Sequence, residues 1–442
     1  MKPEPLLSDA NPASMGGAVH GGEVQGGAVH GGEERLLSLD AYRGLIMIAL
    51  AFNGFGLAKT AAARLADRPD SEFWQTIKYQ FSHVEWEGCG FWDLIQPSFM
   101  FMVGVSMAFS YVKRAAKGDG WSQLFFHALW RSLVLVLLGV FLSSTGSESK
   151  TTNWTFMNVL SQIGLGYPLL FLMWRRSIFL QTAMVGILLA GTWFAYTAYS
   201  PSGINLDTGH PEVGITREWA QTHLVAIDSA WHKNANIGHA LDLRLLNWFP
   251  RSTPFLFNAG GYQTINFLPS LATMLIGLIC GELIRANWMA SRKLMLLIVL
   301  GCVGIIAGLA WHQFGCPIVK RIWTPSWALF STGICCLILA SFYGTIDVLG
   351  WRRWSGFLVV VGMNSIAIYF MGQLLRGWTA GRLQVHIGQP ILNLLGSERI
   401  AKWHEAYPFL SDYAPMLNDI SVGMVFWLAC VWMARQRIFI RV

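Results

Sequence analysis

Ten apolar runs of about 20 residues divide this sequence, and they constrain its fold more than any other feature. A helix needs about 20 apolar residues to cross roughly 30 Å of hydrocarbon. Hydrophobic residues make up 53% of the 442 and charged residues only 13%, a composition that excludes an ordinary soluble domain. We therefore predict an all-α polytopic membrane protein with about ten transmembrane helices. They lie near residues 39–58, 92–112, 123–143, 154–174, 177–199, 264–285, 294–313, 324–346, 355–376 and 413–434.

The connections between these runs predict the orientation in the bilayer. Short loops rich in Lys and Arg stay on the cytoplasmic side. Counting ten spans places Arg35 and the tail residue Arg435 on that same side, so both termini are predicted to be cytoplasmic. The connection 59–91 and the long connection 200–263, between the fifth and sixth spans, are then extracytoplasmic. The basic connections are those holding Lys113, Arg114 and Lys117; Arg175 and Arg176; Arg285, Arg292 and Lys293; and Arg352 and Arg353.

Residues 1–34 differ in composition from the rest of the chain. The octapeptide Gly-Gly-Ala-Val-His-Gly-Gly-Glu occurs at 16–23 and again at 26–33. Such a Gly-rich stretch has too few large apolar side chains to bury a core. We predict a disordered cytoplasmic tail, in which His20 and His30 form at most a weak metal site. Residues 35–442 are predicted to form the membrane domain, with 200–263 as an extracytoplasmic insertion.

Charge and cysteine usage narrow the possible partners. The net charge of +7 is accounted for by the basic loops and tail, so it does not indicate a nucleic-acid partner. The seven Cys show no C-x-x-C spacing, and the four His of 200–263 follow no ligand pattern, so no metal is expected. Cys89 and Cys316 both map to the extracytoplasmic side, and the sequence leaves open whether they form a disulfide.

His83 is the leading candidate for chemistry. It precedes the second span in Phe81-Ser82-His83-Val84-Glu85-Trp86-Glu87-Gly88, on the predicted extracytoplasmic side. Imidazole is the side chain best suited to moving protons near neutral pH. Asp93 begins the second span, where a carboxylate is costly unless it is paired. We therefore predict that Asp93 holds the His83 ring in one tautomer, as carboxylates do for catalytic His.

The first span carries two further candidates. Asp40 and Arg43 lie one helical turn apart and can pair, which anchors the helix at the headgroups. The alternative for Arg43 is the binding of an anionic cytosolic ligand, since guanidinium suits phosphate. Asn53 stands among glycines near the extracytoplasmic end of the span. Its amide would stabilise a developing oxyanion or make a hydrogen bond between helices, and the sequence leaves both open.

The ninth span contains the adjacent polar residues Asn364 and Ser365. Polar groups deep in an apolar run contact either a ligand or a neighbouring helix. We predict that these two residues contribute to cofactor binding together with Arg43.

Several motifs, in a shared order across residues 35–434, resemble those of the heparan-alpha-glucosaminide N-acetyltransferase family and its bacterial relatives. They are Leu39-Asp40-Ala41-Tyr42-Arg43-Gly44, His83-Val84-Glu85-Trp86-Glu87-Gly88 leading to Asp93-Leu94-Ile95-Gln96-Pro97, Gly260-Gly261-Tyr262-Gln263-Thr264-Ile265-Asn266, Trp323-Thr324-Pro325-Ser326-Trp327 and Gly362-Met363-Asn364-Ser365-Ile366.

The resemblance implies transmembrane acetyl transfer, from cytosolic acetyl-CoA as co-substrate to an amino sugar or glycan on the far side. The active His of the family matches His83, and an Asn at the end of its first conserved helix matches Asn53. It also implies a multi-pass protein of the lipid bilayer, here a bacterial inner membrane, and favours a homodimer. The competing hypotheses are a membrane O-acyltransferase acting on a polysaccharide or lipid-linked glycan, and a small-solute transporter. A transporter is disfavoured because the two halves show no convincing internal repeat.

Overall fold

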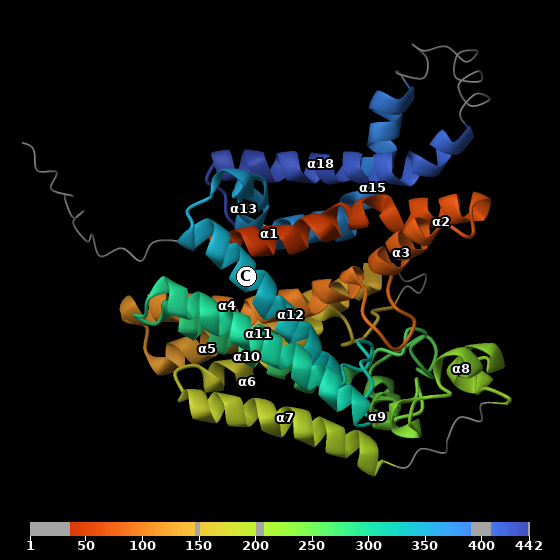
Figure 1. The fold of residues 1–442 in the computed structure, drawn as a ribbon, viewed down its shortest axis with the longest axis horizontal. Coiled ribbons are helices and arrows are strands. Elements are labelled where there is room, and N and C mark those ends of the chain that lie inside the picture. The colour runs from red at the N-terminus through yellow and green to blue at the C-terminus, as the bar shows by residue number, and fades with distance from the viewer. Residues whose placement is uncertain (1–35, 146–150, 200–206, 390–407, 441–442) are drawn as a thin grey trace, which may run out of the picture. The chain divides into compact units, whose positions relative to one another are not determined.

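The computed structural model describes residues 36–145, 151–199, 207–389 and 408–440, and in these segments the chain forms helices and no β-strand (Figure 1). The predicted tail, residues 1–34, lies outside the described residues. Seven helices are long and apolar enough to cross a membrane, so the predicted all-α polytopic membrane fold is confirmed. They are α4 (Ile95–Ala116), α5 (Trp121–Thr145), α7 (Ile178–Ala198), α10 (Phe267–Arg285), α11 (Ala290–Gln313), α12 (Pro325–Phe342) and α18 (Ala414–Arg435).

Two of the predicted spans are bent helix pairs. In the first, α1 (Leu37–Ala51) is followed at 46° by a segment that contains α2 (Leu57–Asp67). In the second, α13 (Gly356–Met363) is followed at 72° by α14 (Ser365–Phe370) and α15 (Arg376–Leu383). If each pair is one span, the described residues contain up to nine spans.

The predicted span 154–174 corresponds to a shorter helix, α6 (Val159–Met173). Asn158 caps this helix, since its Oδ1 accepts the Ser161 N–H at 2.9 Å. An Asn cap fixes the first helical turn, so residues 154–158 stay outside the helix. The predicted run was therefore too long at its beginning.

Glycines allow close helix packing where backbones meet. A Cβ on Gly44 would lie 1.9 Å from the Leu358 carbonyl oxygen, and one on Gly362 would lie 1.8 Å from that of Asp40. These contacts join α1 to α13 at a separation that no larger residue permits. Helices α4 and α10 pack in the same way through Gly104 and Gly277.

The connections outside the apolar spans are folded as well. Residues 59–91 contain the end of α2 and the helix α3 (Glu72–Phe81), and the described part of 200–263 contains α8 (Arg217–His223) and α9 (Ile237–Leu245). Residues 207–263 share a buried apolar core with the loop after α3 and the loop before α12. Members of this core include Trp86, Ile215, Trp231, Val319 and Ile322.

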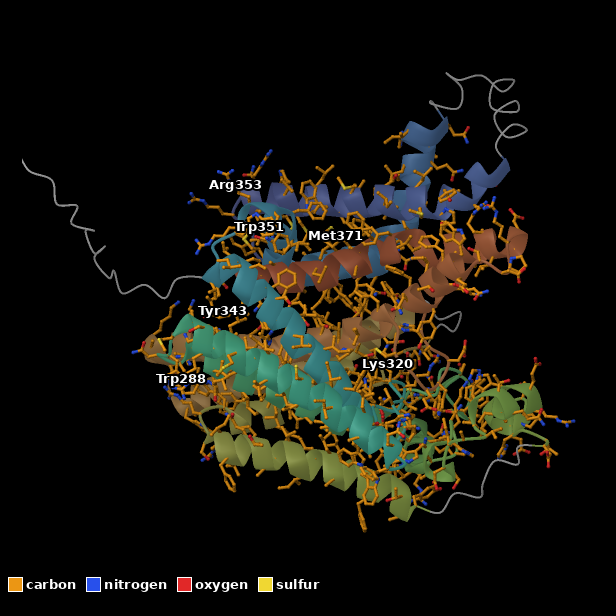
Figure 2. All side chains as sticks on the ribbon, in the orientation of Figure 1. Trp288, Lys320, Tyr343, Trp351, Arg353 and Met371 are labelled. Carbon is orange, nitrogen blue, oxygen red and sulfur yellow. The ribbon has the colours of Figure 1, made fainter. Side chains whose placement is uncertain are left out.

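The helix ends separate two groups of residues. Figure 2 shows Lys320 at the end of the helices beside the 207–263 segment, with Arg353, Trp351 and Trp288 at the opposite end. Arg353 belongs to the loops predicted to be cytoplasmic. The sidedness of the membrane remains a prediction from the sequence.

Candidate active site

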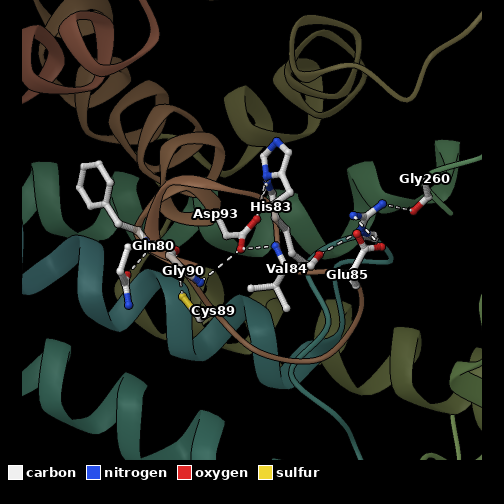
Figure 3. A network of polar contacts seen from close by, with 11 residues as sticks. Gln80, His83, Val84, Glu85, Cys89, Gly90, Asp93 and Gly260 are labelled. Carbon is white, nitrogen blue, oxygen red and sulfur yellow. Dashed lines mark hydrogen bonds and ion pairs between the residues drawn. The ribbon is translucent and has the colours of Figure 1, made fainter. Parts of the chain in front are cut away.

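The loop after α3 presents His83, and Asp93 fixes that loop. The 3₁₀ turn Phe91–Leu94 begins at Gly90, and Asp93 Oδ2 accepts the Gly90 N–H at 3.2 Å. The same oxygen accepts the Val84 N–H, also at 3.2 Å. One carboxylate oxygen therefore holds the backbone on both sides of the loop, as the dashed lines in Figure 3 show.

The other carboxylate oxygen contacts the imidazole. Asp93 Oδ1 lies 2.8 Å from His83 Nδ1, and the exposed fractions of the two side chains are 2% and 44%. Nε2 of His83 has no hydrogen-bond partner within the described part of the chain. The structure thus brings together the two residues that the sequence paired, with one ring nitrogen anchored and the other directed away from the carboxylate.

A third charged group, Lys320, was not predicted. Its Nζ lies 3.1 Å from His83 Nδ1 and 3.2 Å from Asp93 Oδ1, and the residue is only 5% exposed. Burial lowers the pKa of Lys320, and the Asp93 carboxylate opposes that shift. A signal was present in the sequence: Lys320 and Arg321 stand together directly before an apolar span, on its predicted extracytoplasmic side.

The loop that carries Lys320 is held by the cap of α12. Thr324 Oγ1 accepts the Trp327 N–H at 3.3 Å, and its hydroxyl donates to the Pro317 carbonyl at 2.7 Å. The Gly88 N–H donates to the Ile318 carbonyl at 3.0 Å and so joins this loop to the His83 loop. The Trp-Thr-Pro motif noted in the sequence thus acts here by shaping the turn that delivers Lys320.

Arg321 connects the His83 loop to the 207–263 segment. Its Nε donates to the Val84 carbonyl at 3.2 Å and one terminal nitrogen donates to the Gly260 carbonyl at 2.9 Å (Figure 3). The other terminal nitrogen lies 4.0 Å from a Glu85 carboxylate oxygen. Because these bonds join three segments that are distant in sequence, Arg321 stabilises the shape of the site.

Asn53 lies at the break of the first bent pair. Asn53, Gly54, Phe55 and Gly56 all have positive φ, which ends α1 and starts α2 in a new direction. The Asn53 amide donates to Asp419 Oδ2 at 2.9 Å, and Arg376 donates to Asp419 Oδ1 at 3.2 Å. The structure therefore bonds Asn53 to α18, and not to His83.

A cavity of about 450 Å³ adjoins this break. Trp92 lines the cavity and its ring centroid lies 6.4 Å from that of His83, so one side chain borders both features. A Cβ on Gly54 would be 3.3 Å from the Trp92 ring, which packs the break against the start of the second span. The lining also includes Leu50, Ala51, Asn53, Ile368, Tyr369, Gly372, Gln373, Arg376 and Gly377.

The three residues predicted to bind the cofactor form hydrogen bonds or ion pairs with other parts of the chain. Arg43 pairs with Asp40 at 3.3 Å, which confirms the predicted pair, and donates to Ser106 Oγ at 2.5 Å. Asn364 donates to the Ile438 carbonyl at 3.1 Å and accepts the Ile440 N–H at 3.2 Å. Ser365 donates to the Gly362 carbonyl at 2.8 Å. Their roles toward a cofactor remain predictions.

Within the described segments, no group of three or more His, Cys, Asp or Glu residues is placed to hold a metal ion. Cys89 and Cys316 are free thiols here, and burial raises their pKa values to about 12 and about 11. The disulfide that the sequence left open is therefore not formed in this structure.

The fold and the site define a polytopic helical membrane protein that anchors an imidazole with a buried carboxylate next to a cavity. No family model matches the chain. The chain is 22% identical to the heparan-alpha-glucosaminide N-acetyltransferase of Mus musculus over 403 residues, which cover 82% of this chain and 58% of that protein. For the Homo sapiens protein of that name the values are 21% over 376 residues, 76% and 52%. The chain is thus a distant relative of these N-acetyltransferases, and spans somewhat more than half of their length.

Proposed function

We propose that this protein is a transmembrane acetyltransferase. It takes acetyl-CoA from the cytosol as co-substrate and acetylates an amino sugar or glycan acceptor on the other side of the membrane. The observation that carries the proposal is the anchored, half-exposed imidazole of His83, whose neighbour Trp92 lines a cavity together with Asn53 and Arg376. The distant relationship to N-acetyltransferases supports the same reaction class.

The physical chemistry of the donor suits a helical membrane protein. Coenzyme A carries several phosphate charges, which cannot enter hydrocarbon, whereas the pantetheine arm is neutral. The arm can pass between helices while the nucleotide stays among basic residues on the cytosolic side. A cavity of about 450 Å³ at the break after α1 provides room for the thioester end of that arm.

His83 acts as the general base in this scheme. With Nδ1 bonded to Asp93, Nε2 removes a proton from the acceptor amine as the amine attacks the acetyl carbonyl. The new C–N bond forms, the C–S bond breaks, and the proton passes from Nε2 to the departing thiolate to give coenzyme A. The Asn53 amide nitrogen carries two N–H donors. One donates to Asp419, and the other is available to the developing oxyanion.

The test is acetyl transfer in membranes or detergent, with labelled acetyl-CoA and a panel of amino sugars and glycans. We expect His83→Ala to lower the rate by about 10²–10⁴-fold. The matched control is His312→Ala, which removes an imidazole that pairs with Glu87 at 3.2 Å. Full transfer by His83→Ala would contradict the role of His83, and a wild-type protein that neither binds coenzyme A nor transfers acetyl would contradict the function.

Mass spectrometry of the quenched reaction addresses the order of the steps. An acetyl group found on His83 in the absence of acceptor would make the imidazole a nucleophile that carries the acetyl, in place of a base. Products that are cleaved by mild hydroxylamine would indicate an ester, and hence O-acetylation of a hydroxyl acceptor.

A further inference from the structure

Three polar atoms meet within hydrogen-bond distance at the centre of the site. His83 Nδ1 lies 2.8 Å from Asp93 Oδ1 and 3.1 Å from Lys320 Nζ, and Nζ lies 3.2 Å from the same carboxylate oxygen. A ring nitrogen that carries a proton donates, and one that does not carry a proton accepts. Since Nδ1 holds at most one proton, it can satisfy only one of its two charged neighbours at a time.

The two arrangements differ in whether the other ring nitrogen, Nε2, carries a proton. If Nδ1 carries the proton and donates to Asp93, Nε2 of the neutral ring is bare and can accept a proton. If the Lys320 ammonium donates to Nδ1 instead, the proton of the neutral ring resides on Nε2, which then cannot act as a base. Lys320 favours the first arrangement when it donates to Asp93, because the paired carboxylate stays ionised and keeps accepting from Nδ1.

The ammonium also opposes the doubly protonated ring. An imidazolium at His83 would place a second positive charge about 3 Å from Lys320 Nζ. Two like charges this close repel each other even at the dielectric constant of water, and more strongly in a drier site. Lys320 is 5% exposed, so solvent screens this repulsion weakly.

Other ionisable groups around the ring are already engaged or neutral. Arg321 bonds to the Val84 and Gly260 carbonyls and faces Glu85. Burial raises the pKa of the Cys89 thiol to about 12 and raises the pKa of Tyr262, so both stay neutral. Asp93 and Lys320 are therefore the charges in direct contact with the imidazole.

We propose that Lys320 is a positioning residue that keeps His83 singly protonated on Nδ1, with Nε2 bare, by pairing with Asp93 and by opposing the imidazolium. This inference rests on the proposed function only in that a bare Nε2 is what the base requires. The chemistry at Nε2 itself can be followed without any acetyl transfer.

The experiment measures the reaction of His83 with diethyl pyrocarbonate as a function of pH, by peptide mass spectrometry on the full-length protein in detergent. The reagent modifies the bare imidazole nitrogen, and the half-exposed ring is accessible to it. We expect Lys320→Met to move the midpoint of His83 modification to higher pH by about one unit or more. Lys320→Arg keeps the charge and should leave the midpoint near that of wild type.

The matched control is Lys233→Met. Lys233 is also buried, 7% exposed, and burial also lowers its pKa, but its Nζ lies over the Trp219 ring at 4.6 Å and has no bond to His83. Its loss should not move the midpoint. An unchanged midpoint in Lys320→Met, or an equal shift in Lys320→Arg, would overturn the inference.

A second pair of variants covers the case in which Lys320→Met does not fold, because it leaves the Asp93 carboxylate buried without a cation. Asp93→Asn should move the midpoint to lower pH, and adding Lys320→Met to it should move the midpoint back up. No difference between that single and double variant would also contradict the inference. An inactive wild-type protein with the expected midpoints would instead contradict the proposed function alone.

Discussion

Each of the two bent helix pairs breaks at an asparagine, and the two asparagines have different hydrogen-bond partners. Asn53 follows α1 and bonds to Asp419, which is paired with Arg376. Asn364 separates α13 from α14, is fully buried, and uses both ends of its amide on the backbone of Ile438 and Ile440. The first amide borders a cavity, whereas the second bonds to the backbone of the C-terminal segment.

The difference shows how a polar group at a helix break is satisfied. At the end of α1, Arg376 donates to the carbonyls of Leu50 and Ala51 at 3.0 and 2.8 Å. At this break, side chains therefore satisfy the backbone carbonyls. They leave hydrogen-bond donors and space for a ligand. At Asn364 the C-terminal segment supplies backbone groups, so one N–H and the oxygen of that amide are bonded to the chain itself.

The largest effect should come from Arg376→Met. It leaves the Asp419 carboxylate, 3% exposed, without its cation, which costs about 3–5 kcal/mol when a buried pair is broken. Thermal unfolding in detergent measures the loss. Arg114→Met, which breaks an exposed pair with Asp119, is the control and should cost less than about 1 kcal/mol. Equal losses would show that the ion pair does not organise the break at Asn53.

Asn53→Ala should lower kcat for acetyl transfer by about 10²–10³-fold, the usual effect of removing one oxyanion donor. The comparison is with Asn364→Ala, measured per folded molecule, which should keep its kcat. If both variants lost kcat equally, or if Asn53→Ala lost none, the functional distinction between the two breaks would be wrong.

Asn364→Ala should instead reduce stability by about 1 kcal/mol, because it removes two hydrogen bonds to the backbone of Ile438 and Ile440. Hydrogen exchange of the Ile440 amide, which donates to Asn364 Oδ1, reports the local part of that loss. Asn364→Asp retains an acceptor for this N–H but not the donor to Ile438, so its exchange should lie between those of wild type and the Ala variant. Unchanged exchange in both variants would mean that the tail is held elsewhere.

A smaller effect on stability is expected from Asp242, which is 1% exposed and has no ion pair within the described part of the chain. Asp419, in contrast, pairs with Arg376. Burial raises the pKa of Asp242 to about 6. The native state therefore retains a proton that the unfolded state releases, and stability falls as pH rises from about 4 to about 6. Asp242→Asn should reduce the pH dependence of the thermal unfolding midpoint across that window. A dependence as steep as that of wild type would contradict the assignment.

The apolar spans and the Asp40–Arg43 pair were predictable because both depend on residues close together in sequence. Hydrophobicity accumulates within one segment, and residues three apart on a helix meet whatever else the chain does. The contact between His83 and Asp93 was predictable for the same reason, since ten residues separate them. The bend after α1 was not, because a run of positive φ that includes Asn53 and Phe55 is selected by packing against Trp92 and α18.

Partners that lie far apart in sequence account for what could not be predicted. Lys320 reaches His83 across 237 positions, and Asn53 reaches Asp419 across 366. No local pattern connects such pairs, and only the packing of α4 and α12 and of α1 and α18 brings them together. Composition did indicate that buried charges must be paired, but not with which residue.

The bond between the Gly88 N–H and the Ile318 carbonyl has a consequence for biosynthesis. The ribosome completes the His83 loop long before it reaches Lys320, so the nascent chain holds the imidazole and its carboxylate without the ammonium. Until Lys320 is synthesised, the Asp93 carboxylate therefore has His83 and the N–H groups of Val84 and Gly90 as partners, without the ammonium. A chain truncated before that point would contain the His83–Asp93 pair and lack the Lys320 side chain that contacts both residues in the complete chain.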